Sequence, residues 1–319
     1  MNGSHRPGRR VAGGTAGLGN RAGARPALWS HGGTIMHRMA VAFAALVLGA
    51  GMASAQTAQS RLIRIGDTGV VKVAYRFDSN PFSFVSDQGE PAGYTVDLCR
   101  LVTRSIARQL GLDKLEIEWT RVDVTNRLEA VANGSADMEC GSTTVTLRRM
   151  MEVDFSSIIF VESTGVLVKS ASGIGRLADL AGRRIAAIAG TTNERAVADQ
   201  LQRRQISATL VPVRNREEGI AALEEGRVDA FASDKLLLAG AKTKDPRALT
   251  MLPDDLSFEP YAITLPRGDW ALRLAVNTAL AEIYRRGDNL KIFDKWFSPM
   301  GLRPSLLLGA AFALGTLPE

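Results

Sequence analysis

From residue 70 to residue 286, segments with the pattern of buried strands alternate with segments that have the pattern of amphipathic helices. Two helical stripes are clear, over residues 95–110 and 269–286, where apolar side chains recur every three or four positions. We expect the strands to lie at 70–76, 115–122, 136–140, 184–190, 208–213, 228–233 and 261–266. Strands that alternate with helices form mostly parallel sheets covered on both faces, so the sequence predicts an α/β fold.

The alternation pauses at residues 160–175 and 256–268, and we expect the chain to cross between two lobes at these points. On this interpretation lobe 1 is discontinuous, with residues 61–162 and 259–319, and lobe 2 is the insert, residues 163–258. Two α/β lobes joined by two crossovers enclose a cleft, which the carboxyl ends of the strands and the loops after them face. These loops are where we expect a binding site.

The first 55 residues differ from the rest, because they contain six arginines but no lysine, aspartate or glutamate. A basic start around Arg38, a short apolar run and the small residues 53–55 are typical of a secretory signal peptide. We therefore expect a signal peptide at 36–55, cleavage near Ala55/Gln56 and export to the periplasm. Residues 1–35 lack hydrophobic periodicity, and we interpret them as a misassigned start upstream of Met36 or a disordered extension.

Removing this segment changes which functions the composition allows. The net charge of +6 disappears, because the rest of the chain has 33 basic and 33 acidic side chains, so no nucleic-acid partner is expected. All three histidines lie in the removed part, which excludes Ser-His-Asp and Cys-His catalysis and His-ligated metals. We expect no catalytic residue, cofactor or metal. An even number of cysteines in an exported chain favours a disulfide between Cys99 and Cys140; the alternative is two buried free thiols.

Charged side chains lie at the ends of several predicted strands or in the segments that follow them, among them Arg76, Arg127, Arg149, Arg216 and Asp234. Each arginine alone is more typical of a solvated surface charge, so the argument depends on their joint placement near strand ends. A guanidinium group and the amides at a helix N-terminus can bind the α-carboxylate of an amino acid, whereas its α-ammonium, once buried, requires a carboxylate. Arg149 and Asp234 fit these two roles, and the surplus arginines predict a second carboxylate on the ligand.

The stretch "ECGSTTVTLRR", residues 139–149, joins a strand to a helical run. It has one glycine and no Gly-Lys-Ser/Thr ending, so it is a poor match to a phosphate-binding loop. Its hydroxyls suit a helix cap instead, with Thr144 or Thr146 as the capping residue. Such a cap is compatible with ligand binding by the same segment.

Several motifs, in this order along the chain, resemble the periplasmic solute-binding proteins of amino-acid ABC importers, and most closely the glutamate/aspartate-binding branch. They cover nearly all of residues 61–300 and are "NPFSF" (80–84), "GYTVDLC" (93–99), "NRLEAVANGSADMECGSTTVTLRR" (126–149), "VDFSSIIFV" (153–161), "AGTTNE" (189–194), "GRVDAFASDKLLLAG" (226–240) and "FDKWF" (293–297). The resemblance implies a type II periplasmic-binding-protein fold, in which two lobes joined by two hinge crossovers close around the ligand.

The resemblance also implies a role for individual residues. Arg149 and Thr144 are expected to hold the ligand's α-carboxylate, with further hydrogen bonds from Ser142 and Thr192. Asp234 is expected to hold the α-ammonium.

Arg76 and Arg127 match arginines that recognise the side-chain carboxylate of glutamate or aspartate, and other branches usually lack an arginine at both places. Two residues depart from the pattern. Arg216 stands where the branch is expected to have a histidine, and Val124 stands where it can have a ligand-contacting serine. Arg216 adds positive charge, which keeps an anionic ligand consistent but can shift the preference among dicarboxylates.

The expected function is periplasmic capture of L-glutamate or L-aspartate by a monomer and delivery to an ABC permease, with no reaction catalysed. The resemblance also supports the Cys99–Cys140 disulfide. One alternative is an exported enzyme on the same fold, such as a cyclohexadienyl dehydratase, with Glu139, Glu194 or Glu217 as the general acid. Another is a free sensory amino-acid-binding protein.

Overall fold

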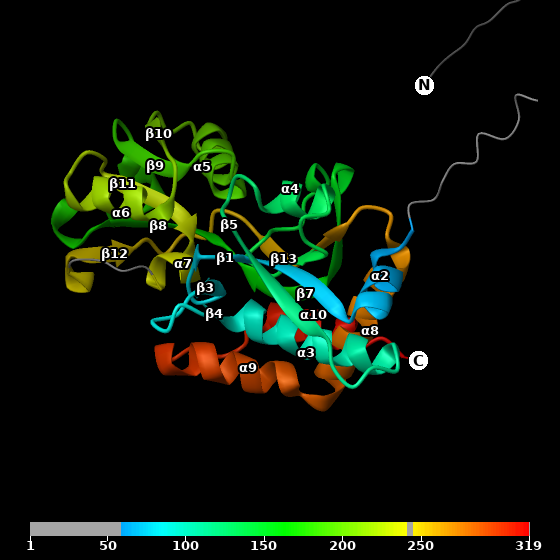
Figure 1. Cartoon of the computed structure of the whole chain (residues 1–319). Coiled ribbons are helices and arrows are strands. Elements are labelled where there is room, and N and C mark those ends of the chain that lie inside the picture. The colour runs from blue at the N-terminus through cyan, green and yellow to red at the C-terminus, as the bar shows by residue number, and fades with distance from the viewer. Residues whose placement is uncertain (1–58, 241–244, 319) are drawn as a thin grey trace, which may run out of the picture. The chain divides into compact units, whose positions relative to one another are not determined.

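The computed structural model describes residues 59–240 and 245–318, and the predicted extension, signal peptide and cleavage site lie outside these residues (Figure 1). The described α-helices are α2 (Arg61–Thr68), α3 (Tyr94–Gln109), α4 (Arg127–Ala132), α5 (Thr192–Arg203), α6 (Arg216–Glu224), α7 (Lys235–Ala239), α8 (Trp270–Arg286), α9 (Asp288–Phe297) and α10 (Leu306–Gly315).

The strands form two five-stranded sheets and one small three-stranded sheet. The first large sheet has the order β5 (Glu116–Val122), β1 (Val70–Arg76), β6 (Met138–Glu139), β13 (Glu259–Pro266), β7 (Val153–Glu162). The second has the order β10 (Thr209–Val213), β9 (Arg184–Ile188), β11 (Ala230–Asp234), β8 (Thr164–Lys169), β12 (Leu249–Met251). The small sheet contains β2 (Asp78–Ser79), β3 (Ser83–Val85) and β4 (Pro91–Ala92).

The two large sheets share one plan. In the first, β1 is parallel to β5 and β6, and β13 runs antiparallel to both β6 and β7. In the second, β9 is parallel to β10 and β11, and β8 runs antiparallel to β11 and β12. Each sheet therefore has a single reversed strand in its fourth place.

Helices cover both faces of each large sheet. Successive residues of a strand point to opposite faces, so adjacent residues pack against different helices. In β1, Val73 packs into a core that includes side chains of α3, α8 and α9, whereas the adjacent Ala74 packs on the other face with Val131 of α4. In β11, Ala232 packs with Val197 of α5, and Phe231 packs on the opposite face with residues of α6. This confirms the predicted two-lobed α/β fold; we call each large sheet with its helices a lobe.

The chain crosses between the lobes twice. It leaves β7 at Glu162 and enters β8 at Thr164, and it returns from β12 to β13, which begins at Glu259. Glu162 and Glu259 are paired in the β7–β13 register, so the two crossing segments lie side by side. The strands of the first sheet lie within residues 70–162 and 259–266, and those of the second within 164–251; the lobe boundaries proposed from the sequence stay a prediction.

Some elements were not expected from the sequence. Residues 160–175 looked like a pause but contain the end of β7 and all of β8, whose residues are almost all buried and so show no alternation. The apolar segment near the end of the described residues forms α10, which packs on β7 and α8 through Leu308 and Phe312.

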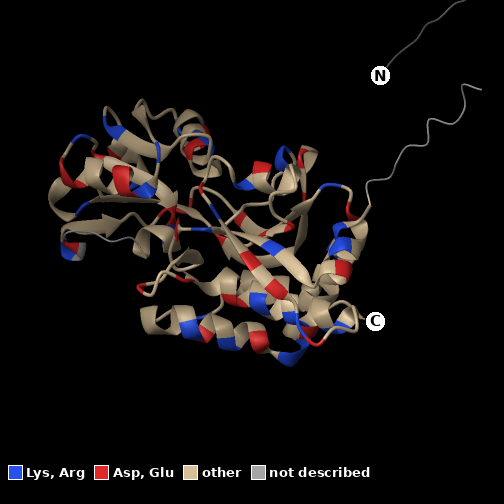
Figure 2. Cartoon of the chain, in the orientation of Figure 1, with Lys and Arg blue, Asp and Glu red and all other residues tan. Residues whose placement is uncertain are grey.

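Among the described residues, no helix is both long enough and apolar enough to span a membrane. Figure 2 shows basic and acidic residues intermixed over both lobes, in agreement with the equal numbers of basic and acidic side chains after residue 55.

Candidate ligand-binding site

The segment after β6 is packed too closely for any residue other than glycine at position 141. A Cβ atom there would lie 2.1 Å from Oε1 of Glu139 and 2.8 Å from Cγ of Arg76. Ser142, Thr143 and Thr144 follow and are all buried. Neither candidate cap directly precedes the short 3-10 turn that begins at Arg149, because Arg148 does, but Thr146 Oγ1 accepts a hydrogen bond from the Arg149 amide at 3.1 Å. The hydroxyl of Thr144 is therefore available for other contacts.

A small pocket lies between the two lobes, and seven of the eight candidate residues line it: Arg76, Arg127, Ser142, Thr144, Thr192, Arg216 and Asp234. The eighth, Arg149, does not line the pocket; it is half-buried and its Nη1 donates to the backbone oxygen of Thr144 at 2.8 Å. The adjacent Arg148 is exposed. Val124, where a serine was expected, also lines the pocket.

Three arginines that line the pocket are buried but paired to different extents. Arg76 is paired with Asp78, whose Oδ1 lies 2.8 Å from Nε and 2.7 Å from Nη2. Arg127 donates from Nη1 to the backbone oxygen of Ser142 at 3.3 Å, and Arg216 donates from Nη1 to the backbone oxygen of Asp78. The Nε atoms of Arg127 and Arg216 have no hydrogen-bond partner. Burial, with the nearby charges of Arg149 and Arg76, lowers the pKa of Arg127 to about 9.

Carboxylates gather on the other side of the pocket, near the crossing segments. Asp234 ends β11, its Oδ1 has no hydrogen-bond partner, and burial raises its pKa, as does the charge of Glu259. Glu259 accepts hydrogen bonds from the hydroxyls of Thr144 at 2.7 Å and Ser257 at 2.6 Å. Burial, together with the charge of Asp234, raises the pKa of Glu162 to about 8. The pocket therefore has arginines that can bind carboxylate groups and a carboxylate with one unpartnered oxygen that can bind an ammonium group.

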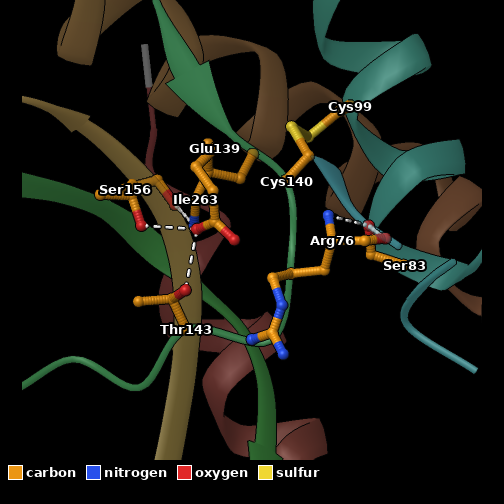
Figure 3. The surroundings of a disulfide bond; sticks show 9 residues. Arg76, Ser83, Cys99, Glu139, Cys140, Thr143, Ser156 and Ile263 are labelled. Carbon is orange, nitrogen blue, oxygen red and sulfur yellow. Dashed lines mark hydrogen bonds between the residues drawn. A yellow bond between two sulfur atoms is a disulfide. The ribbon is translucent and has the colours of Figure 1, made fainter. Parts of the chain in front are cut away.

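The three glutamates considered as general acids do not line this pocket. Glu139 is fully buried beside it, where its Oε2 accepts from the hydroxyls of Thr143 and Thr264, both at 2.8 Å (Figure 3). Glu194 accepts from the amide of Gly190 at 2.8 Å, and Glu217 is exposed.

A disulfide joins Cys99 of α3 to Cys140, directly before the segment that enters the pocket (Figure 3). Both cysteines are completely buried in the core of the first lobe. The predicted pair is therefore present, and it fixes the end of β6 to α3, one of the helices that cover this face of the sheet.

Sequence reasoning missed several residues of the site. Asn193 and Ser233 line the pocket next to the predicted Thr192 and Asp234, and adjacency to those residues was the only available signal. Asp78 was also missed, although an acidic residue two positions after Arg76 could have indicated an ion pair. Glu162 and Glu259 come together only through strand pairing, which the local sequence does not specify.

Comparison with known proteins agrees with this geometry. Residues 71–299 match the family model for bacterial extracellular solute-binding proteins, family 3. The chain is 35% identical over 248 residues to the L-glutamate/L-aspartate-binding protein of Pseudomonas aeruginosa, covering 76% of this chain and 82% of that one. It is 31% identical over 268 residues to the glutamate/aspartate import solute-binding protein of Escherichia coli K12, covering 82% and 89%.

A solved structure shares the fold at 27% identity and a TM-score of 0.64, covering 75% of this chain and 100% of that one. It is an ancestral amino acid-binding protein described as a precursor of cyclohexadienyl dehydratase. The fold, the pocket between two lobes and the family match over most of its length agree, and the chain belongs to the family 3 bacterial extracellular solute-binding proteins.

Proposed function

We propose that this protein binds an acidic L-amino acid, glutamate or aspartate, in the pocket between its lobes and delivers it to an ABC importer. The observation that carries the proposal is the set of buried arginines, two of them with unpartnered Nε atoms, opposite the unpartnered Oδ1 of Asp234. Unpaired buried charges are costly, and a ligand with two carboxylates and one ammonium supplies the missing partners.

In the proposed complex Asp234 binds the α-ammonium. Arg149 and Thr144, already joined by a hydrogen bond, bind the α-carboxylate with Ser142 and Thr192. The side-chain carboxylate is bound by the remaining arginines that line the pocket, Arg76, Arg127 and Arg216. The names of the two relatives at 35% and 31% identity support an acidic ligand.

The proposal includes a monomer that works in the periplasm and is recognised by a membrane permease in its closed state. It does not include catalysis. The contacts of Glu139, Glu194 and Glu217 support this, because Glu139 is held by two hydroxyl donors, Glu194 by the amide of Gly190, and Glu217 is exposed.

Calorimetry on protein unfolded, freed of ligand and refolded tests the proposal. We expect L-glutamate or L-aspartate to bind with a dissociation constant below about 100 μM, and prephenate to bind without being converted. If neither acidic amino acid binds in that range, or if prephenate is consumed, the proposed function is wrong.

A matched pair of variants tests the carboxylate site. Arg149→Ala should weaken binding by roughly 100-fold, because it leaves a desolvated carboxylate without its charged partner. Arg148→Ala, which removes the exposed neighbour, should leave the affinity unchanged. Equal effects of the two substitutions would contradict the assignment.

A further inference from the structure

Asp78 forms an ion pair with one edge of the guanidinium group of Arg76, an arginine that lines the pocket. Its Oδ1 accepts hydrogen bonds from both Nε and Nη2 of Arg76, at 2.8 and 2.7 Å, and the two side chains are only 11% and 4% exposed. The backbone oxygen of Asp78 also accepts a hydrogen bond from Nη1 of Arg216, which belongs to the other lobe. One acidic residue therefore holds two of the arginines that line the pocket.

The position of Asp78 separates its charge from the space for the ligand. It lines a neighbouring cavity, together with Phe77 and Asn80, and not the pocket that contains Asp234. Figure 3 shows the Arg76 side chain extending away from the disulfide and from Ser83, whose hydroxyl accepts a hydrogen bond from the Arg76 amide at 3.0 Å. Its Nε–Nη2 edge is used by Asp78, so Arg76 contributes a largely neutralised pair to the pocket.

Arg127 and Arg216 differ from Arg76 in this respect. Their Nε atoms have no hydrogen-bond partner, although both residues are buried. Because an arginine stays charged in proteins, these two side chains present positive charge and an unpartnered Nε donor near the ligand's side chain. Nearby carboxylates, Asp78 and Asp234 in the case of Arg216, offset part of that charge. A carboxylate that is fixed close to them reduces the attraction that this region has for anions.

We propose that Asp78 determines how much negative charge the pocket accepts on the ligand side chain. By cancelling the charge of Arg76 it favours a side chain with one negative charge over a side chain with two. This inference rests on the proposed function, because it concerns the specificity of the same site.

The substitution Asp78→Asn isolates the charge, because asparagine keeps an oxygen that can accept from Arg76. Calorimetry with L-glutamine, L-glutamate and O-phospho-L-serine then varies the side-chain charge from zero to about −2 at nearly constant length. We expect little change for glutamine, tighter binding of glutamate by several-fold, and tighter binding of O-phospho-L-serine by roughly tenfold or more. Asp67→Asn, which removes an exposed carboxylate of α2, should change none of the three affinities.

The relative sizes of the three changes in affinity test whether Asp78 acts through its charge. Equal changes for all three ligands, or weaker binding of glutamate by a variant whose melting curve is intact, would show a structural role and overturn the proposal. Asp78→Glu keeps the charge, so it should retain the wild-type ranking of the ligands; a ranking like that of Asp78→Asn would also overturn it.

Failure of the proposed function is distinguishable from failure of this inference. If wild-type protein binds glutamate and Asp78→Asn gives no charge-dependent gain, the function stands and the inference falls. If only the variant binds acidic ligands, the inference stands and the function falls. If neither protein binds them, both are wrong.

Discussion

Individual residues at this pocket combine deep burial with incomplete pairing. Arg127, Arg216 and Asp234 are each less than 8% exposed, and each has a side-chain polar atom without a hydrogen-bond partner. A buried charge without a partner destabilises the protein that contains it, so a ligand that supplies the partner recovers that free energy on binding. The residues that define the ligand are therefore also a source of instability in its absence.

Glu162 gives a prediction at the same scale. Its pKa is raised from 4.5 to about 8, first by burial and then by the charge of Asp234. Between these values the folded protein holds a proton that the unfolded chain releases. The resulting stabilisation is complete below about pH 4.5 and is lost as the pH rises through about 8.

We therefore expect the free energy of unfolding of the wild type, relative to that of Glu162→Gln, to decrease between pH 5 and pH 8.5, as measured by urea titration. The exposed Glu152, changed to glutamine, serves as the control and should show the wild-type profile. Parallel pH profiles for wild type and Glu162→Gln would contradict the raised pKa.

At the scale of elements, the connection between α3 and β6 determines where the segment 141–149 begins. Buried Cys140 follows β6 directly, and its disulfide to Cys99 links residues 41 positions apart. Ser142 and Thr144, which line the pocket, come within four residues of this link. The same disulfide thus joins the core of the first lobe to one wall of the pocket.

Removing this link should lower stability. For a closed loop of 41 residues, the chain-entropy model gives about 4 kcal/mol of stabilisation by the disulfide. The double variant Cys99→Ala/Cys140→Ala should lose about this much in urea unfolding. A reductant should then destabilise the wild type by a similar amount and leave the double variant unchanged. A loss of less than about 1 kcal/mol would show that the disulfide does not constrain the chain in this way.

At the scale of the whole molecule, few direct side-chain contacts connect the lobes across the pocket. Those between described residues include Thr144 Oγ1 with Thr192 Oγ1 at 3.4 Å, Asn80 Nδ2 with the backbone oxygen of Gly240 at 3.3 Å, and Arg216 with the backbone of Asp78. Because these contacts are few and the crossing segments are only two, a ligand that binds residues of both lobes should favour the closed arrangement.

Small-angle X-ray scattering measures this arrangement directly. We expect the radius of gyration of ligand-stripped protein to decrease when saturating L-glutamate is added. Arg149→Ala should need roughly 100-fold more L-glutamate for the same decrease, since its affinity is lowered by that factor. An unchanged radius for wild-type protein that binds glutamate by calorimetry would mean that binding does not close the lobes.

The sequence predicted the features that depend on neighbouring residues and missed those that depend on residues far apart in the chain. β1 and β9 were predicted because each is a short segment rich in apolar residues, and Arg76 was predicted because it ends the first of them. The pairing of Glu162 with Glu259 was not, because strand register depends on residues far apart in the chain. β8 was missed because its apolar run is short and is followed directly by the serine- and glycine-rich residues 170–175.

The adjacency of the two crossing segments has a consequence for protein engineering. Because Glu162 and Glu259 are neighbours across the β7–β13 ladder, everything from β8 to β12 enters and leaves the first lobe at nearly the same place. A short turn can therefore replace that portion without interrupting any strand of the first sheet, and a domain with closely spaced ends can be grafted in its place. Such a replacement must also fill the place of Leu237 of α7, which packs in the core of the first lobe, so hybrids are best designed around that contact.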